Sequence, residues 1–242
     1  MTEILAVNNL TKCFGRLRAV DGLTFDVQEG EILGLMGPNG AGKTTVFNLL
    51  TGVDKADEGT ITFAGKDITR KAPAKRCREG IGRTYQIPQP FDKLSVFENL
   101  LVSAAHGGGL SEKKAREELA EILELIDLAD VKDKLAGTLP LLDRKRLELG
   151  RAIATRPKII LLDEVAGGLT GAESEQVMSI VKEIQKRGMT IVWIEHILMM
   201  MAEGVDRLLV ISHGRWLKCG EPGDVMGSQD VLECYMGVED EA

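Results

Sequence analysis

The sequence lacks any hydrophobic run long enough to span a bilayer, which needs about 20 apolar residues in a row. The best candidate, residues 190–201, is short and is interrupted by Glu195 and His196. The first residues also lack the basic start and long apolar stretch of a signal peptide, so we expect a cytosolic chain that another subunit would have to bring to a membrane. The four cysteines form no C-x-x-C pair and show no zinc spacing, which favours free thiols over disulfides.

Charge and composition argue against a second group of functions. Lysine and arginine total 30 against 37 aspartates and glutamates, which gives a net charge of -7. Binding along a nucleic-acid backbone usually needs a basic surface, so this balance argues against a broad nucleic-acid footprint but leaves room for a local basic patch. Hydrophobic residues make up 44% and charged residues 28%, as in ordinary globular proteins, and 242 residues can form one large core with or without an inserted lobe.

A glycine-rich segment carries the strongest chemical signal. Residues 37–45 read GPNGAGKTT and match the pattern G-x-x-x-x-G-K-[ST] at every constrained position. The glycines allow a tight turn that brings backbone N–H groups against phosphate oxygens, Lys43 can place its charge on the β and γ phosphates, and the Thr44 hydroxyl can ligate Mg²⁺. An apolar run precedes the segment and a helical pattern follows it, so a helix N-terminus would face the anion. The sequence therefore predicts a nucleoside triphosphate site formed by Gly37, Pro38, Asn39, Gly40, Ala41, Gly42, Lys43, Thr44 and Thr45.

A second motif lies far downstream, where residues 158–164 read KIILLDE. This is the pattern of a buried strand that ends in paired carboxylates. In a phosphate site, Asp163 can hold the Mg²⁺ shell while Glu164 activates an attacking water. A strand ending in Asp-Glu is often only a strand that meets solvent, but the phosphate loop upstream favours the functional interpretation.

Short apolar runs alternate with helical patterns, which predicts an α/β fold with a largely parallel sheet. Strands are expected at residues 4–7, 23–27, 31–36, 60–63, 158–162, 190–195 and 207–212. The part before Gly30 is typical of an antiparallel hairpin. Between about residues 95 and 156 the pattern becomes helical, and we expect an inserted helical lobe there. One helix face is expected to contain Ala115, Leu119, Ile122, Leu123 and Ile126.

Taken together, these motifs resemble the ATP-binding subunits of ABC transporters over essentially the whole chain. The resemblance implies a single ABC domain over residues 1–242, with a P-loop NTPase (RecA-like) core, an N-terminal antiparallel β subdomain and the inserted helical subdomain. It also implies that Phe14 stacks on adenine, that Gln86 senses nucleotide in the Q-loop, and that His196 stands at the switch position. The implied catalytic residues are Glu164, His196 and Gln86, the implied metal ligands are Thr44, Gln86 and Asp163, and the implied cofactors are ATP and Mg²⁺.

The chain departs from the family at its signature, which is LSGGQ in the family and LPLLD at residues 139–143 here. Pro140 removes a hydroxyl and an N–H, and the two leucines that follow add bulk where a partner's ATP would approach. Asp143 is interpreted as the cap of the following helix. Smaller departures are Val165 and Thr170. In the family, the signature of one subunit contacts the ATP held by the other, so each ATP site of the dimer is a composite of both subunits. Two copies of this signature would impair both composite sites of a homodimer, and we therefore expect a heterodimer with a related ATPase subunit.

Residues 83–104 and 220–237 resemble the ATP-binding subunits of branched-chain amino-acid importers and their relatives for amides. This resemblance implies ATP-driven dimer closure coupled to membrane permease subunits, and a peripheral location on the cytoplasmic face of the cell membrane. Two alternatives stay open: a soluble ABC ATPase that is not coupled to transport, and an ABC subunit whose degenerate signature impairs hydrolysis. A GTPase is disfavoured because the sequence has no N-K-x-D motif.

Overall fold

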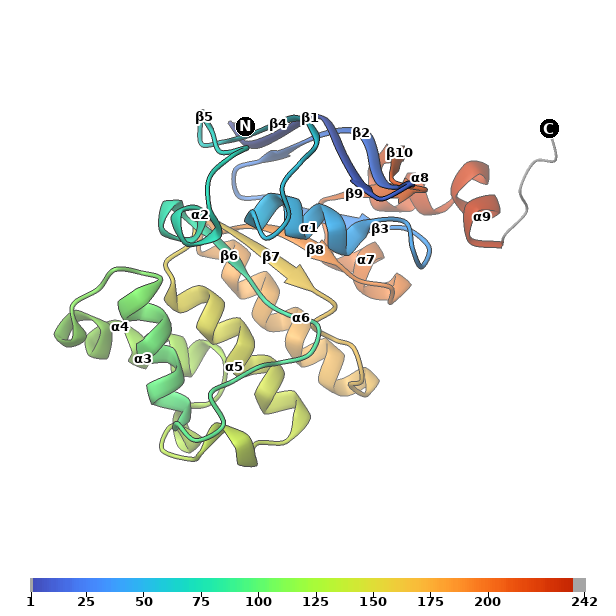
Figure 1. The fold of residues 1–242 in the computed structure, drawn as a ribbon. Helices are drawn as coiled ribbons and strands as arrows, with labels where there is room; N and C mark the ends of the chain where they lie inside the picture. The colour runs from blue at the N-terminus through green and yellow to red at the C-terminus, as the bar shows by residue number, and fades with distance from the viewer. Residues whose placement is uncertain (1, 237–242) are drawn as a thin grey trace. The chain divides into compact units, whose positions relative to one another are not determined.

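The computed structural model describes residues 2–236, and its elements are labelled in Figure 1. The chain divides into two compact units, one made of the residues up to 73 together with those from 190 onward, the other of residues 74–189. Within the described residues, no helix is long and apolar enough to cross a membrane.

An antiparallel sheet opens the first unit. β1 (Glu3–Phe14) pairs with β2 (Leu17–Gln28) on one side and with β4 (Glu58–Phe63) on the other, and β5 (Lys66–Asp67) extends the sheet beyond β4. Leu5, Val7 and Leu10 of β1 are fully buried, so the strand packs one face against the interior. The predicted N-terminal hairpin is thus confirmed, and its two strands are longer than the short apolar runs that predicted them.

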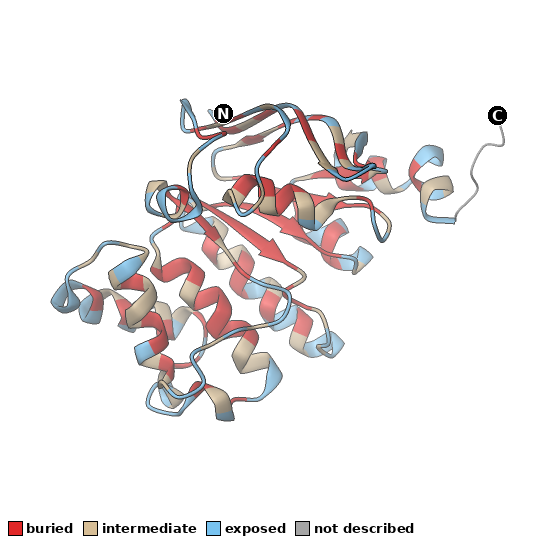
Figure 2. Cartoon of the chain, in the orientation of Figure 1, coloured by how far each residue is buried: buried red, intermediate tan, exposed pale blue. Residues whose placement is uncertain are grey.

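The same unit contains a parallel group of strands. β3 (Ile32–Met36) lies between β8 (Thr190–Ile194) and β9 (Arg207–Ser212) and runs parallel to both, while β10 (Arg215–Gly220) pairs antiparallel with β9. Every residue of β3 and β8 is buried, as expected for parallel strands covered on both faces, and Figure 2 shows this burial along the strands. The helices of this unit are α1 (Lys43–Thr51), α7 (Leu198–Gly204), α8 (Pro222–Met226) and α9 (Gln229–Met236).

The second unit is mostly helical. Its two strands, β6 (Ile81–Arg83) and β7 (Ile159–Asp163), pair in parallel. The helical elements are α2 (Pro73–Glu79), α3 (Val96–His106), α4 (Glu112–Leu125), η1 (Ala129–Val131), η2 (Ala136–Thr138), α5 (Leu141–Ala154) and α6 (Gly171–Lys186). Residues 96–154 contain only helices and their connections, and the boundaries of the inserted subdomain stay a prediction.

Local sequence signals explain where two of these helices begin. Ser95 caps α3 and Thr170 caps α6, each in a capping box with the glutamate three residues later. The amphipathic pattern in α4 buries Ala115, Leu119 and Leu123, as its spacing predicted.

The strand predictions missed β5, β6 and β10. β5 has two residues and β6 has three, including Gly82 and Arg83, so neither gives a periodic apolar signal. β10 carries exposed Arg215 and Trp216 and no buried residue, because it pairs at the edge of its sheet.

Candidate nucleotide site

The glycine loop connects β3 directly to α1. Gly42 is the N-cap of α1, has a φ of 102° and makes no side-chain capping bond, so the helix begins with backbone N–H groups that no side chain caps. A Cβ added to Gly42 would lie 2.3 Å from the carbonyl oxygen of Ala19, and one added to Gly37 would lie 2.2 Å from that of Ile211. The loop therefore has a shape that only glycine allows at these two positions.

The ammonium of Lys43 folds back across this loop. Its Nζ donates hydrogen bonds to the carbonyl oxygens of Gly37 at 2.7 Å and Pro38 at 3.0 Å. Thr44 is exposed, which leaves its position accessible to a ligand. A turn with close-packed glycines, an uncapped helix N-terminus and a cation fits the phosphates of a nucleotide.

His196 reaches the same edge of the parallel strands. β3 and β8 are neighbours with Leu35 opposite Ile194, so the glycine loop and the segment that carries His196 leave their strands at the same end. The imidazole side chain is 63% exposed, and its Nδ1 lies 3.9 Å from an oxygen of Glu195, which is too long for a hydrogen bond. The structure thus brings this predicted residue to the edge that carries the phosphate loop.

Phe14 ends β1 and is about half exposed at 48%, so its ring is accessible for stacking. The ammonium of Lys12 lies 5.3 Å from the ring centroid, within cation–π distance. Its role against adenine stays a prediction.

Asp163 and Glu164 lie in the second unit, where β7 ends. Asp163 is buried, and its Oδ2 accepts a hydrogen bond from Nη2 of Arg83 at 2.9 Å. Glu164 has a φ of 46°, in the left-handed region that few non-glycine residues adopt, and strain of this kind gathers at functional sites. Nε2 of Gln86 donates to its Oε2 at 2.6 Å. Two of the three predicted catalytic residues are therefore in direct contact.

A buried lysine that the sequence analysis did not single out fixes the backbones of both residues. Lys145 of α5 is only 2% exposed, and its Nζ donates to the carbonyl oxygens of Gln86 at 2.6 Å and of Glu164 at 3.0 Å. One ammonium thus links the Q-loop to the end of β7, although 59 residues separate Lys145 from Gln86.

Two more charged residues of α5 extend this link. Nη1 of Arg151 donates to the carbonyl oxygen of Gln89 and to Glu148, each at 2.8 Å, and its guanidinium lies 5.4 Å from the ring centroid of Phe91. Burial raises the pKa of the Glu148 carboxyl, while Arg151 and the backbone N–H groups of Tyr85 and Gln89 act in the opposite direction. We call Lys145, Glu148 and Arg151 the α5 clamp, since together they hold the Q-loop from residue 85 to residue 91.

The predicted metal ligands are divided between the two units. Gln86 and Asp163 belong to the second unit and Thr44 to the first. Among residues 2–236, no three acidic, histidine or cysteine side chains gather into a metal site. A site with one carboxylate, one amide and one hydroxyl would not form such a group, so the Mg²⁺ site stays a prediction.

The degenerate signature forms the start of α5, with Pro140 at the N-cap and no side-chain capping bond. The prediction that Asp143 caps this helix was wrong, because α5 begins two residues earlier. Asp143 lies in the first turn instead, with an oxygen 3.4 Å from Arg146. Leu141 is exposed, and a Cβ at Gly168 would lie 3.3 Å from its Cδ2. A bulky apolar side chain therefore stands in the first turn of α5, at a position of the signature where the family pattern LSGGQ has glycine.

Comparisons with known proteins bear on these features. The family model described as "ABC transporter" matches residues 20–167. The probable branched-chain amino acid transport ATP-binding protein LivG of Methanocaldococcus jannaschii is 38% identical over 97% of this chain and 98% of its own. The lipopolysaccharide export system ATP-binding protein LptB of Haemophilus influenzae is 32% identical with the same coverage.

Among solved structures, the ADP conformation of MJ1267, an ATP-binding cassette of an ABC transporter, superposes with a TM-score of 0.91 at 36% identity. The match covers 98% of this chain and 100% of that one. These comparisons confirm the predicted fold class and the resemblance to importer subunits for branched-chain amino acids. The chain belongs to the ABC transporter family, as an ATP-hydrolysing subunit of a transporter with a P-loop NTPase core.

Proposed function

We propose that this chain powers an importer of branched-chain or related amino acids by closing and reopening a dimer of ATPase subunits against membrane permeases. The observation that carries the proposal is the contact between the side chains of Gln86 and Glu164, whose backbone carbonyl oxygens both accept hydrogen bonds from Lys145. This contact connects two parts of the proposed mechanism. Glu164 is suited to activate water, and the loop that carries Gln86 is suited to contact another subunit. The names of similar proteins support the choice of solute.

In this proposal each unit contributes its own part of the machinery. Phe14 stacks on adenine, the N–H groups of residues 37–45 and Lys43 hold the phosphates, and His196 contacts the γ-phosphate. Glu164 accepts a proton from the attacking water, whose oxygen bonds to the γ-phosphorus as the bond to ADP breaks. Mg²⁺ would be held by Thr44, Gln86 and Asp163, and when bound it neutralises charge on the phosphate oxygens.

An apolar patch of the Q-loop is the proposed contact with the permease. Tyr85, Ile87 and Phe91 are exposed, and the clamp residue Arg151 backs Phe91. Exposed aromatic and aliphatic side chains on one short loop fit a helix from a membrane subunit. Binding there would keep the chain on the cytoplasmic face of the cell membrane.

The signature favours a heterodimer. A proline at the N-cap and an exposed leucine in the first turn leave α5 without the hydroxyl and the small residues that would approach a partner's nucleotide. In a heterodimer only one composite site would be impaired. Expressed alone, the chain should hydrolyse ATP slowly, and co-purification with its permeases and a second ATPase subunit should restore fast turnover. Fast, cooperative hydrolysis by the chain alone would refute the heterodimer.

The variant Glu164→Gln tests the catalytic assignment. It should bind ATP as the wild type does, while turnover of the assembled complex falls about 10²- to 10⁴-fold, the usual contribution of a general base. Glu175→Gln, which changes an exposed glutamate of α6, serves as the control. Near-normal turnover would remove Glu164 from this role. Leucine-stimulated ATPase activity of the complex, compared with stimulation by urea, tests the solute.

A second candidate is an ABC subunit whose degenerate signature impairs hydrolysis even in the complex, which the shape of the α5 start favours. Replacing Pro140→Ser together with Leu141→Gly and Leu142→Gly distinguishes the two. If the native signature limits turnover, the repaired complex should hydrolyse ATP about tenfold faster or more. Unchanged turnover would exclude this second candidate.

A further inference from the structure

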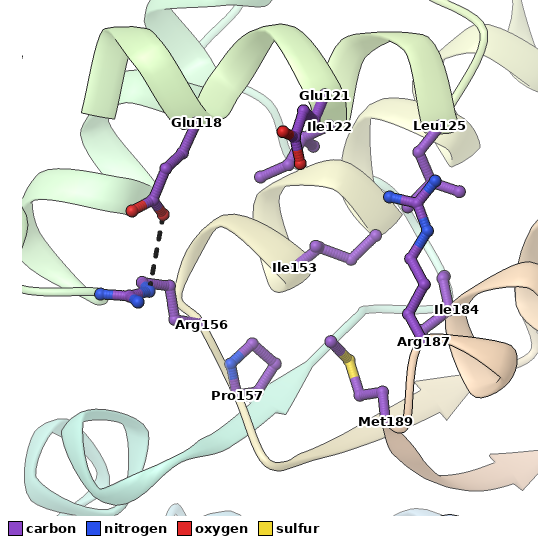
Figure 3. Close-up of a pocket in the computed structure, with 10 residues that line it drawn as sticks. All are labelled: Glu118, Glu121, Ile122, Leu125, Ile153, Arg156, Pro157, Ile184, Arg187 and Met189. Carbon is purple, nitrogen blue, oxygen red and sulfur yellow. Dashed lines mark ion pairs between the residues drawn. The ribbon is translucent and has the colours of Figure 1, made fainter. Parts of the chain in front are cut away.

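A cavity of about 370 Å³ opens in the second unit (Figure 3). It is lined from α4, from the end of α5 and the turn that follows, and from the end of α6 and the turn that precedes β8. Its apolar lining includes Ile122, Leu125, Ile153 and Met189. A volume in this range suits a small molecule with an apolar part.

Two opposite charges belong to this lining, from different helices. Glu121 projects from α4, and its carboxylate makes no ion pair or hydrogen bond with any residue that the structure describes. Arg187, just beyond α6, donates from Nε to Glu183 at 3.3 Å. Its two terminal nitrogens have no hydrogen-bond partner among residues 2–236. The cavity therefore offers an acid and a forked cation to a ligand.

Two further charged side chains of the lining, Arg156 and Glu118, pair with each other. Nε of Arg156 lies 3.5 Å from Glu118, and Figure 3 shows this ion pair at the opposite side of the cavity from Arg187. Among the charged side chains of this lining, Glu121 alone makes no ion pair with residues 2–236, while Arg156 and Arg187, each paired through Nε, keep their terminal nitrogens for a ligand.

We propose that this cavity binds a free aliphatic α-amino acid of the size of leucine. The ammonium would pair with Glu121, the carboxylate would accept from the terminal nitrogens of Arg187, and the side chain would cover Ile153 and Met189. A simple amine would leave the terminal nitrogens of Arg187 without an acceptor, a simple anion would leave Glu121 unpaired, and a purely apolar molecule would do both. An internal peptide segment has neither free terminus. A zwitterion with an aliphatic chain matches all three features.

The proposal has a structural consequence. A bound amino acid would join α4 to the end of α6, two segments that otherwise face each other across the opening (Figure 3). Binding should therefore stabilise the folded chain by an amount that grows with the logarithm of the ligand concentration above its Kd. Naming leucine as the probe follows from this geometry and does not depend on which solute the transporter carries.

Binding to the purified chain tests the proposal directly. Calorimetric titration with leucine up to about 10 mM should give a saturable signal, and leucine should raise the melting temperature. Isoamylamine lacks the carboxylate and 4-methylpentanoate lacks the amine, so each should bind about tenfold more weakly or worse. Glycine keeps both charges without the apolar chain and should also bind weakly.

Charge variants on the surface, which should fold normally, locate the site. Glu121→Gln and Arg187→Gln should each weaken leucine binding about tenfold. Glu117→Gln, an exposed glutamate of α4 outside the cavity, should leave it unchanged. Arg116→Gln is the matched arginine control, because Arg116 also pairs with a glutamate four residues away and does not line the cavity.

Three outcomes would overturn the proposal. The first is no saturable binding of leucine, and the second is binding that neither cavity variant weakens. The third is equal binding of leucine and of the two analogues with a single charge, which would indicate an unspecific apolar cavity. If leucine binds as expected while the transporter carries another solute, the cavity proposal stands and the choice of solute fails.

Discussion

The α5 clamp gives a sharp test of how this ATPase subunit positions its catalytic groups. Lys145 is almost fully buried and donates two hydrogen bonds, to the carbonyl oxygens of Gln86 and Glu164. The variant Lys145→Met keeps the length and most of the volume of the side chain but removes both donors. Stability and turnover should respond separately, and both can be measured.

The magnitude follows from those two bonds. A hydrogen bond from a charged donor contributes about 1.5–3 kcal/mol, so two would give about 3–6 kcal/mol if nothing compensated. Methionine also removes the free-energy cost of burying an ammonium, and water can reach Gln86, which is exposed. We therefore expect the free energy of unfolding to fall by about 2 kcal/mol. Urea unfolding of the purified chain measures this loss.

Turnover should fall further than stability alone explains. Without Lys145, no ammonium holds the backbones of Gln86 and Glu164 together, so their side chains can move relative to each other. A shift of about 1 Å in a catalytic group can reduce a rate about 10²-fold. We expect kcat of the assembled complex to fall about 10- to 100-fold, with the affinity for ATP nearly unchanged because the phosphate loop is intact.

Lys113→Met is the control, because Lys113 is exposed on α4 and makes no ion pair with the part of the chain that the structure describes. A kcat within about twofold of wild type for Lys145→Met would refute the positioning role. An unchanged free energy of unfolding would refute the clamp itself.

Three further predictions concern the loop, the clamp and a helix cap. Gly42→Ala should lower the free energy of unfolding by about 2 kcal/mol or more and weaken ATP binding, because its Cβ would lie 2.3 Å from a backbone carbonyl oxygen. Gly40 also has a positive φ, of 81°, but has open space around it, so Gly40→Ala should lower the free energy of unfolding by only about 1 kcal/mol. Urea unfolding and ATP titration measure both. Because burial raises the pKa of Glu148 in the folded chain, the wild type should gain stability relative to Glu148→Gln as the pH falls from neutral toward 4.5. It should lose that gain as the pH rises through the pKa of the folded state. Urea unfolding of both proteins at several pH values measures the difference in the free energy of unfolding, and a difference that stays constant with pH would contradict the prediction. Ser95→Ala should lower the free energy of unfolding by about 1 kcal/mol, since it breaks the capping box with Glu98, and a change below the error of urea unfolding would contradict the cap.

Much of the fold was predictable because its signals are local. The segment from β3 through the glycine loop to α1 combines a strand-length apolar run, turn residues with special backbone angles and a helix pattern within a few residues. The hairpin of β1 and β2 and the amphipathic α4 were predictable for the same reason. The edge strand β10 was missed because pairing, and not its own side-chain pattern, makes it a strand.

The cap of α5 shows where local reasoning fails. Aspartate is a favoured N-cap residue, so residue type alone predicts that Asp143 caps the helix. The helix begins earlier, after Pro140, whose fixed φ suits the entry to a helix, and Asp143 pairs with Arg146. Intrinsic preference is a weak guide when the neighbouring residues also permit a helix.

The phosphate loop, the carboxylates at the end of β7 and the family could all be identified from residue types at short, fixed spacings along the chain. That Lys145, Glu148 and Arg151 contact the Q-loop could be seen only in the folded chain. Charged residues spaced along a helix usually mark a solvated face, but here Lys145 and Glu148 are buried and Arg151 is partly buried, because the Q-loop lies against them and supplies carbonyl and N–H partners. Those partners are remote in the chain, and no local pattern encodes a contact that exists only after the loop and the helix have packed together.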